Sequence, residues 1–432
     1  MKICVYGLWH LGSVTAACLA DCGFEVCGLD PDAKTVENLA AGHAPLFEPG
    51  LDELIARGIA SGRLSFSSDA QKALSGADFL WVAFDTPVDD NDRADVAYVS
   101  GRTLEAVKHL RHEGGVIISS QAPVGFVRGL EIECAKRYPE KGMYFACSPE
   151  NLRLGKAISV FSNPDRIIIG VRRDEHIKKF EPVFGKITPR LEWMRTESAE
   201  MTKHAINSFL AMSVVFANEL AGICESVGAD AAEVARGLKT EERIGPKAYV
   251  GPGTAFAGGT LARDINFVIE TGARFSKSTL LFKAINEGNE AHKSWVRRKL
   301  AEVVGELKGK KAAVLGLTYK PGTSTLRRSL SVELCKWLVS EGAVVTAYDP
   351  FAEPLPEPLA SSVKRAGSIA QAASSADVVI LGTEHKDFQN SVAADLAALS
   401  GRPVIDPSGF LRKALEKTPD IKYFCVGRGE RL

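Results

Sequence analysis

The N-terminal part of the chain alternates short apolar runs with helical segments. Residues 3–6 form an apolar run, a glycine turn follows, and residues 13–20 are predicted to be helical. A second apolar run at 25–29 ends at Asp30. Further strand signals occur at 79–84, 115–119 and 166–171. Strands that alternate with helices are typical of a parallel sheet covered on both faces.

The pattern changes in the middle of the chain. One long helix is predicted from residue 197 to about 228, and a second helical region covers 261–307. At Lys310 the strand-glycine-helix pattern restarts (KKAAVLGLTYKPG). We therefore predict an α/β fold with two Rossmann-like doubly wound domains joined by a central helical domain. The predicted domains are 1–195, 196–305 and 306–432.

Composition restricts the possible partners. The 432 residues are 45% hydrophobic and 25% charged, which suits a globular protein with more than one core. The 53 basic residues balance the 53 acidic ones, so no overall field attracts nucleic acid or an anionic membrane. Because no uninterrupted apolar run reaches about 18 residues, we expect no membrane-spanning segment. We expect neither nucleic acid nor a membrane as a partner.

The cysteines indicate the compartment. The chain has 9 cysteines, an odd number, without CxxC or Cys/His metal-ligand spacing. Scattered cysteines of this kind are typical of free buried thiols in a reducing environment. We predict a cytoplasmic protein without a metal site.

The first glycine turn carries a dinucleotide-binding pattern. Residues 7–12 (GLWHLG) lie between a predicted strand and a predicted helix, where a Rossmann fingerprint belongs. Gly7 and Gly12 fill the first and third glycine positions, whereas Trp9 stands at the second. Asp30 follows 18 residues after Gly12; its carboxylate suits ribose hydroxyls and repels a 2′-phosphate, which favours NAD over NADP. Alternatively, Asp30 simply caps the turn after its strand.

Short motifs occur along nearly the whole chain. In the N-terminal half they are FEPGL at 47–51, DTP at 85–87, AD at 94–95, SQAPVG at 120–125, PENLRLG at 149–155 and PDR at 164–166. Further on they are Lys203 with Asn207, RIG at 243–245, GPG at 251–253, GLTYKP at 316–321, Arg327, DP at 349–350 and TE at 383–384. In this order and spacing the set resembles the UDP-glucose/GDP-mannose dehydrogenase family.

The resemblance implies a reaction. In that family the primary alcohol at C6 of a nucleotide sugar becomes a carboxylate. Two hydrides pass to two NAD molecules, and the intermediate aldehyde is held on a cysteine thiol. A lysine and an asparagine stabilise the oxygen anion. A UDP-sugar substrate, a homodimer and a role in polysaccharide biosynthesis are implied as well.

The resemblance assigns candidate residues to each role. The candidate catalytic residues are Lys203, Asn207, Asp264, Glu150, Thr260 and Gln121. The candidate cofactor-binding residues are Gly7, Trp9, His10, Leu11, Gly12, Asp30, Lys34, Thr86, Pro87, Gln121 and Arg263. The candidate substrate-binding residues are Glu150, Leu152, Arg153, Lys203, Asn207, Arg243, Gly258, Lys320 and Arg327. Lys320 and Arg327 are expected to contact phosphate or sugar, and Arg243 is expected to act across the dimer interface.

The loop that should carry the nucleophile departs from the family pattern. It reads GGTLARD at 258–264, against GGSCFPKD in the family. Thr260 stands at the cysteine position, and no cysteine occurs between Cys224 and Cys335. A hydroxyl is a far poorer nucleophile than a thiolate. Other family residues are replaced by Leu154, Gln121, Arg263 and Thr325.

Three functions are consistent with this sequence. The first is full oxidation to the uronic acid through the aldehyde hydrate, which needs no thiol. The second is a two-electron oxidoreductase or epimerase, favoured by the retained Lys203, Asn207 and Asp264 without a nucleophile. The third is a non-catalytic nucleotide-sugar binder, which Trp9 supports. Product stoichiometry separates the first two, and NAD binding tests the third.

Overall fold

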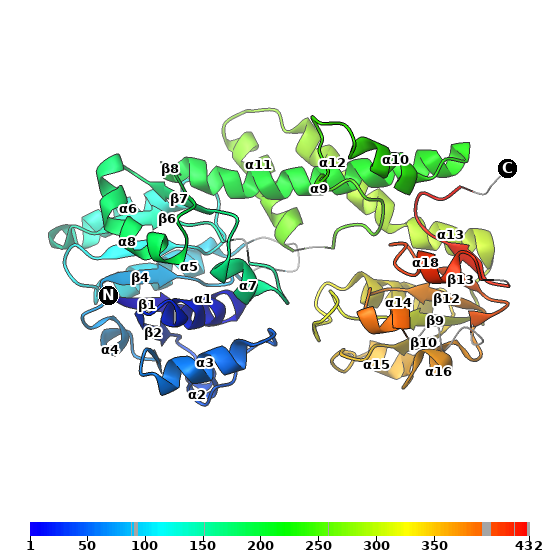
Figure 1. The fold of residues 1–432 in the computed structure, drawn as a ribbon, viewed down its shortest axis with the longest axis horizontal. Coiled ribbons are helices and arrows are strands. Elements are labelled where there is room, and N and C mark those ends of the chain that lie inside the picture. Colours follow the sequence, from blue (N-terminus) through cyan, green and yellow to red (C-terminus); the bar gives the residue numbers. More distant parts are fainter. Residues whose placement is uncertain are drawn as a thin grey trace. The chain divides into compact units, whose positions relative to one another are not determined.

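The computed structural model describes residues 1–87, 89, 94–150, 152–257, 259–390, 399–418 and 420–429. Contacts divide the chain into two compact units, Met1–Ile206 and Asn207–Leu432. Figure 1 shows a sheet with helices in each of them.

The described part of the first unit contains an eight-stranded sheet. Its strand order is β3-β2-β1-β4-β5-β6-β7-β8, and only β6 and β7 pair antiparallel. The strands are β1 (Lys2–Tyr6), β2 (Glu25–Leu29), β3 (Leu64–Ser67), β4 (Phe79–Val82), β5 (Gly115–Ile118), β6 (Tyr144–Cys147), β7 (Ile167–Val171) and β8 (Leu191–Arg195). The chain order reverses between β1 and β4, and doubly wound sheets bind ligands at the carboxyl ends of the strands at such a point.

Helices cover this sheet on both faces. They are α1 (His10–Asp21), α2 (Ala33–Ala40), α3 (Leu51–Ala60), α4 (Ala70–Leu74), α5 (Val96–Val107), α6 (Phe126–Arg137), α7 (Ala157–Ser162) and α8 (Ile177–Ile187). In β1, Ile3 and Val5 belong to one core cluster, and Cys4 and Tyr6 belong to another. Because successive side chains of a strand point to opposite faces, the apolar run of β1 is buried on both sides.

The longest helix is α9 (Thr196–Val227), with 32 residues. Within the described residues it alone is long and apolar enough, by those two criteria, to cross a membrane. This is weak evidence, because core helices of soluble proteins meet the same criteria; 44% of its most apolar stretch is buried in the protein. The sequence places polar and charged residues such as Glu200, Lys203 and Asn207 on this helix, and the absence of a membrane partner stays a prediction.

The second unit joins helices to a parallel sheet. After α9 come α10 (Ala231–Leu238), α11 (Thr260–Arg274), α12 (Leu280–Lys293) and α13 (Trp295–Val303). The six-stranded sheet of the described residues has the order β11-β10-β9-β12-β13-β14. Its strands are β9 (Lys311–Leu315), β10 (Val344–Tyr348), β11 (Val363–Arg365), β12 (Val378–Leu381), β13 (Pro403–Ile405) and β14 (Lys422–Phe424). Its helices are α14 (Leu330–Ser340), α15 (Leu359–Ser362), α16 (Ile369–Ala373) and α18 (Arg412–Leu415).

The predicted fold class is confirmed, with parallel sheets towards both ends of the chain and a helical region between them. The predicted long helix from 197 to 228 is α9, within one residue at each end. The first helix begins at His10 rather than Ser13, because the glycine turn is shorter than the pattern indicated. The domain boundaries near 195 and 305 stay a prediction.

Candidate active site

The first glycine turn packs closely against its neighbours. Gly7 has φ +91°, and a Cβ there would lie 2.6 Å from a ring atom of Phe84. A Cβ on Gly12 would lie 1.7 Å from the carbonyl oxygen of Gly7. Both positions therefore require glycine, for the turn and for the approach of α1 to β1, as in a dinucleotide-binding turn.

Asp30 stands at the carboxyl end of β2, beside this turn. Its Oδ2 accepts the backbone N–H of Leu8 at 2.7 Å, and its Oδ1 accepts that of Asp32 at 3.0 Å. The carboxylate thus caps the local backbone, as one of the two sequence interpretations holds. Since each carboxylate oxygen accepts more than one hydrogen bond, this capping is compatible with a ribose contact.

Trp9, at the second glycine position, is half exposed. It precedes α1 with φ −73° and ψ −149°, and 51% of its surface is accessible. The indole is therefore not packed into the protein core. The paired glycines, Asp30 and the start of α1 fit a pyrophosphate and a ribose. When bound there, NAD supplies a hydride acceptor.

Two other predicted cofactor residues have different surroundings. The Nε2 atom of His10 lies 2.9 Å from Glu48, which also accepts the backbone N–H groups of Gly155 and Ala157 at 2.8 Å each. Glu48, in the FEPGL motif, thereby links α1 to the start of α7. Lys34 is exposed on α2.

The loops after β4 and β5 are joined by a hydrogen bond. Thr86 Oγ1 donates to the carbonyl oxygen of Gln121 at 2.6 Å. Thr86 is buried, Gln121 is partly buried and Pro87 is exposed. The structure therefore brings Thr86 and Gln121 together at the carboxyl end of the sheet, and their contact with the cofactor stays a prediction.

Glu150 and Lys203 form the first pair of candidate catalytic residues. Lys203 Nζ, on α9, donates to the backbone oxygen of Glu150 at 2.5 Å. The Glu150 residue is partly exposed, but its Oε1 atom is shielded and accepts no hydrogen bond from the described part of the chain. Burial raises the pKa of Glu150 to about 7; Lys203 opposes the rise and Asp85 adds to it. A carboxyl group that titrates near neutral pH can both take and give a proton.

Asn207 and Asp264 form the second pair. Asn207 Nδ2, on α9, donates to Asp264 Oδ2, on α11. Asp264 has no accessible surface, and Asn207 has 7%. Asp264 thus fixes the orientation of the Asn207 amide. Along α9, Lys203 and Asn207 are four residues apart and share one helical face.

Thr260 is the first residue of α11 and is exposed. It lies one turn before Asp264 on the same face of the helix. Arg263, between them, is partly buried. Gly258, predicted to bind substrate, lies outside the described residues. The hydroxyl at position 260 is accessible, but no residue in the described part of the chain activates it as a nucleophile.

Three side chains that the sequence did not reveal hold the loop before α11. Asn218 accepts from Gly253 N at 2.9 Å and donates to Thr254 O at 3.3 Å. Asn289 accepts from Phe256 N and donates to Phe256 O, both at 2.9 Å. His292 Nε2 lies 2.8 Å from Gly253 O, and burial lowers the pKa of its imidazole. The sequence carried one signal for Asn218: it follows Asn207 by 11 residues, which is about three helical turns, so the two residues lie on the same side of the helix.

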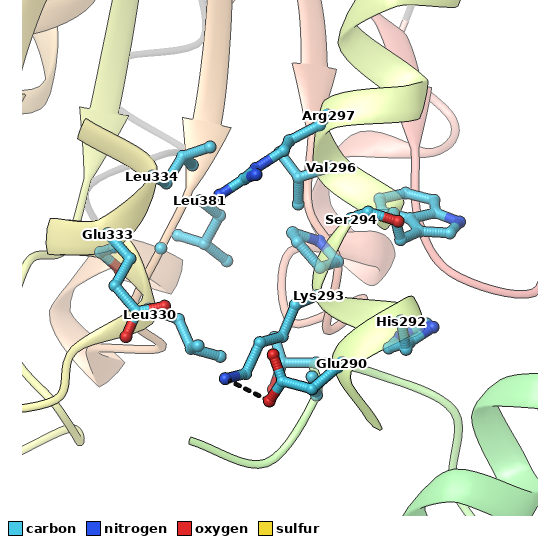
Figure 2. A pocket seen from close by; sticks show the side chains of 16 residues that line it. Glu290, His292, Lys293, Ser294, Val296, Arg297, Leu330, Glu333, Leu334 and Leu381 are labelled. Carbon is cyan, nitrogen blue, oxygen red and sulfur yellow. Dashed lines mark ion pairs between the residues drawn. The ribbon is translucent and has the colours of Figure 1, made fainter. Parts of the chain in front are cut away.

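A cavity of about 220 Å³ opens at the carboxyl end of the second sheet. It lies beside β12, α14 and the junction of α12 with α13 (Figure 2). Leu381, Ser331 and Arg297 are among its lining residues, and Glu290 pairs with Lys293 across 2.7 Å at its edge. The order of the second sheet reverses between β9 and β12, so the cavity occupies the expected ligand position of a doubly wound fold.

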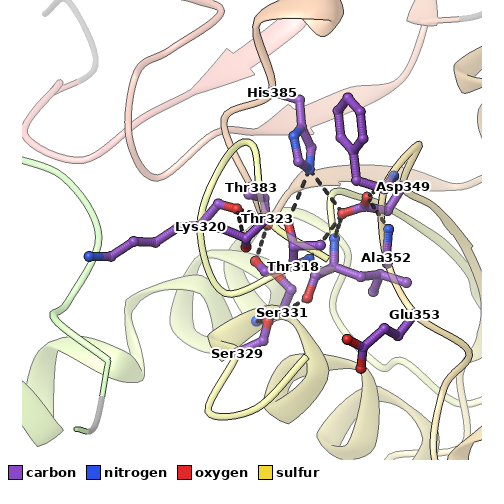
Figure 3. Close-up of polar contacts among 12 residues, drawn as sticks. Thr318, Lys320, Thr323, Ser329, Ser331, Asp349, Ala352, Glu353, Thr383 and His385 are labelled. Atoms are coloured by element: carbon purple, nitrogen blue, oxygen red, sulfur yellow. Dashed lines mark hydrogen bonds and ion pairs between the residues drawn. The ribbon is translucent and has the colours of Figure 1, made fainter. Parts of the chain in front are cut away.

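In the second sheet the residue that corresponds to Asp30 is Asp349, and groups of the same chain form hydrogen bonds with its carboxylate (Figure 3). Asp349, at the end of β10, accepts Leu317 N at 2.6 Å and contacts His385 Nε2 at 3.0 Å. Although burial alone would raise its pKa, hydrogen bonds from His385 and nearby backbone N–H groups hold the pKa well below its usual range. The second acidic strand end is therefore buried and hydrogen-bonded within its own chain, although the topology is Rossmann-like.

The remaining candidate substrate residues are mostly at the surface. In Figure 3 the Lys320 side chain points away from the Asp349 network. Arg153 and Arg327 are exposed. Arg243 is exposed and pairs with Glu241 at 2.7 Å. Leu152 packs against the core of the first unit.

Comparisons with known proteins agree with this arrangement. Three family models match: the UDP-glucose/GDP-mannose dehydrogenase family NAD binding domain over residues 1–188, its central domain over 197–291 and its UDP binding domain over 313–413. A UDP-glucose 6-dehydrogenase of Rhizobium meliloti is 33% identical over 99% of this chain and 100% of its own. One of Bacillus subtilis is 30% identical over 99% and 98%. A UDP-glucose dehydrogenase structure from Pyrobaculum islandicum superposes with a TM-score of 0.90 at 29% identity, covering 99% and 98%. The chain therefore belongs to the UDP-glucose/GDP-mannose dehydrogenase family, and its N-terminal domain is the NAD binding domain of that family.

Proposed function

We propose that this protein oxidises a UDP-sugar at C6 to the uronic acid, with UDP-glucose as the first candidate and NAD as the hydride acceptor. One observation carries the proposal: Lys203 of α9 contacts the backbone oxygen of Glu150, and the pKa of the Glu150 carboxyl group is raised to about 7. Lys203 and Asn207 lie on the same face of α9. The Rhizobium meliloti and Bacillus subtilis relatives, at 33% and 30% identity over 99% of this chain, are UDP-glucose 6-dehydrogenases, and they do not favour an epimerase or a non-catalytic binder.

The first oxidation requires a base and a stabilised oxygen anion. In its ionised form Glu150 accepts the proton of the C6 hydroxyl. The Lys203 ammonium and the Asn207 amide stabilise the negative charge that develops on oxygen. Asp264 acts through Asn207 by fixing its amide group. The carbon then loses a hydride and becomes an aldehyde.

We propose that the second oxidation proceeds through the aldehyde hydrate. Water adds to the aldehyde, so the carbon carries two hydroxyl groups and one remaining hydrogen. Glu150 takes a hydroxyl proton, the carbon loses its hydrogen as hydride, and the carboxylic acid forms without a covalent enzyme adduct. Thr260 supports this route, because its hydroxyl replaces the thiol that would otherwise hold the aldehyde.

The test is a panel of UDP-, GDP- and TDP-sugars incubated with NAD, with NADH followed by absorbance and products identified by mass spectrometry. We expect UDP-glucose to give UDP-glucuronate at the highest kcat/KM in the panel. An isomerised sugar without net NADH, or turnover confined to another base, would overturn the proposal.

The hydrate route predicts that thiol reagents leave turnover unchanged. All 9 cysteines are free, and every one except the partly exposed Cys22 is buried. Burial raises the pKa of Cys22 as well, which reduces the reactive thiolate. Native protein treated with iodoacetamide should keep its kcat, whereas denatured protein should be alkylated throughout. Rapid inactivation that UDP-glucose prevents would contradict the route.

We also propose a homodimer formed through α9. Phe209, Phe216 and Ile223 are 63%, 50% and 60% exposed. Their spacing of seven residues aligns them in one stripe along the helix, and an exposed apolar stripe of this length is typical of a protein interface. A second copy is the proposed partner, because the resemblance also implies that Arg243 acts across a dimer interface.

Replacement of this stripe should separate the subunits. The double variant Phe209→Glu with Phe216→Glu is expected to elute as a monomer in size-exclusion chromatography with light scattering, while the wild type elutes as a dimer. Ile132→Glu is the matched control, because Ile132 is 58% exposed on α6. A wild type that stays monomeric at all concentrations would contradict the dimer.

We propose a cytoplasmic location and a role in supplying uronic acid for polysaccharide biosynthesis. The absence of disulfides among the 9 cysteines supports a reducing compartment. The balanced charge of 53 basic and 53 acidic residues supports the absence of nucleic-acid and membrane partners.

A further inference from the structure

We propose that Asp85 competes with NAD for the N-terminus of α1: in the cofactor-free protein its carboxylate caps the helix, and the pyrophosphate must displace it. This competition takes place in the NAD binding domain and does not depend on which sugar is oxidised.

The first observation is the hydrogen bond that Asp85 makes. The first N–H groups of a helix have no acceptor within the helix. In α1 the earliest backbone bond within the turn is that of Ser13 N to Trp9 O, at 3.0 Å. Leu11 N precedes it and donates instead to Asp85 Oδ2, at 3.3 Å. A carboxylate of the neighbouring loop thus occupies the start of α1.

The second observation is that this helix start is the pyrophosphate position. Gly7 and Gly12 bring the backbone of the turn close enough for a dinucleotide, and the free N–H groups of the helix then bind its phosphates. The pyrophosphate and the Asp85 carboxylate are both anions that use the same donor. They repel one another, so they cannot share it without cost.

The third observation is that Asp85 is held in place from both sides. Phe84 is buried, packs edge-on against Tyr6 with ring centroids 4.7 Å apart, and fills the space beside Gly7. Thr86 donates to Gln121 O at 2.6 Å. Because both neighbours are anchored, the backbone at position 85 is fixed, and only the aspartate side chain can turn away when the pyrophosphate arrives.

The competition has two opposite effects. An acidic group at a helix N-terminus stabilises the free protein, and the same group weakens the binding of an anion there. The Asp85 side chain is exposed, so solvent screens its charge and the effect is moderate. Removal of the charge should therefore tighten NAD binding about tenfold while it lowers the melting temperature of the free protein.

The test measures NAD affinity by titration calorimetry and melting temperature without ligand, for Asp85→Asn and Asp85→Ala. Asparagine keeps an acceptor oxygen and removes the charge, whereas alanine removes both. Asp78→Asn is the matched control: Asp78 accepts the backbone N–H of Lys2 at 2.9 Å, but at the opposite end of β4. ADP and adenosine are compared as probes with and without the diphosphate.

The expected result is tighter NAD and ADP binding in both Asp85 variants, unchanged adenosine binding, and unchanged NAD binding in the control. If Asp85 had only a structural role, its replacement would lower the NAD affinity and the stability of the protein together. Unchanged or weaker NAD binding in both Asp85 variants would overturn the proposal. So would an equal gain for adenosine, because the effect would then not reach the phosphates.

Discussion

Replacement of Lys203 by methionine is expected to lower kcat about a thousandfold, with NAD affinity unchanged. Lys203 Nζ lies 2.5 Å from the backbone oxygen of Glu150, and it is the cation that would stabilise the oxygen anion in both oxidations. Methionine keeps most of the length and apolar contact of the side chain but removes the charge. The measurement is steady-state turnover of UDP-glucose with saturating NAD, alongside NAD titration.

The same substitution should change the pH dependence. Lys203 lowers the pKa of Glu150 against the effect of burial, so its loss should move the acidic limb of residual activity to higher pH. Lys178→Met is the control, because Lys178 is exposed on α8. Retention of kcat within about fivefold in Lys203→Met would contradict a role in charge stabilisation, which is worth far more in comparable enzymes.

The substitution Glu150→Gln is expected to lower kcat by two to four orders of magnitude, about the contribution of a positioned base. Because burial raises its pKa to about 7, the wild-type carboxyl group is protonated below that pH and cannot act as a base. Wild-type activity should therefore fall as the pH drops through about 7. The remaining activity of Glu150→Gln should lack this limb.

Stability provides a second measure of Glu150. Its folded pKa is raised above the usual value of 4.5, so the neutral form is favoured in the folded protein. The contribution of Glu150 to the stability of the folded protein is therefore fully present below the pKa that this residue has in the unfolded chain. It is lost as the pH rises through about 7. At about pH 8.5 the Gln variant should melt at or above the wild-type temperature. Glu140→Gln, at an exposed position, is the control. A large loss of stability in Glu150→Gln would contradict the view that the Glu150 carboxylate is kept for function at a cost in stability.

Regular patterns predicted the fold well. The glycine spacing at Gly7 and Gly12 and the apolar run of β1 depend on neighbours close in sequence, so they identified the first sheet and its cofactor turn. The length of α9 was also readable, because its helical pattern is continuous. The start of the first helix was placed three residues too late. The hydrogen bonding of Asp349 also escaped prediction, because His385 approaches it from 36 residues away.

The sequence supplied candidate site residues, whose roles stay predictions, but it did not supply the contacts among them. The family pattern selected Lys203, Glu150, Asn207 and Asp264, and the structure places the first two in contact and the last two in contact. It did not indicate that Asp85 reaches the start of α1, 74 residues away in sequence. Contacts of this kind depend on where strands end in the sheet, and a single sequence does not show that.

We expect the protein to complete both oxidations without a thiol. The most direct test is the ratio of NADH formed to uronate formed from UDP-glucose under initial-rate conditions, with both products quantified in the same samples. We expect two NADH for each uronate and no sugar adduct on the intact enzyme after rapid quenching. One NADH for each sugar consumed, with an aldehyde as the product, would contradict the claim and identify a two-electron dehydrogenase.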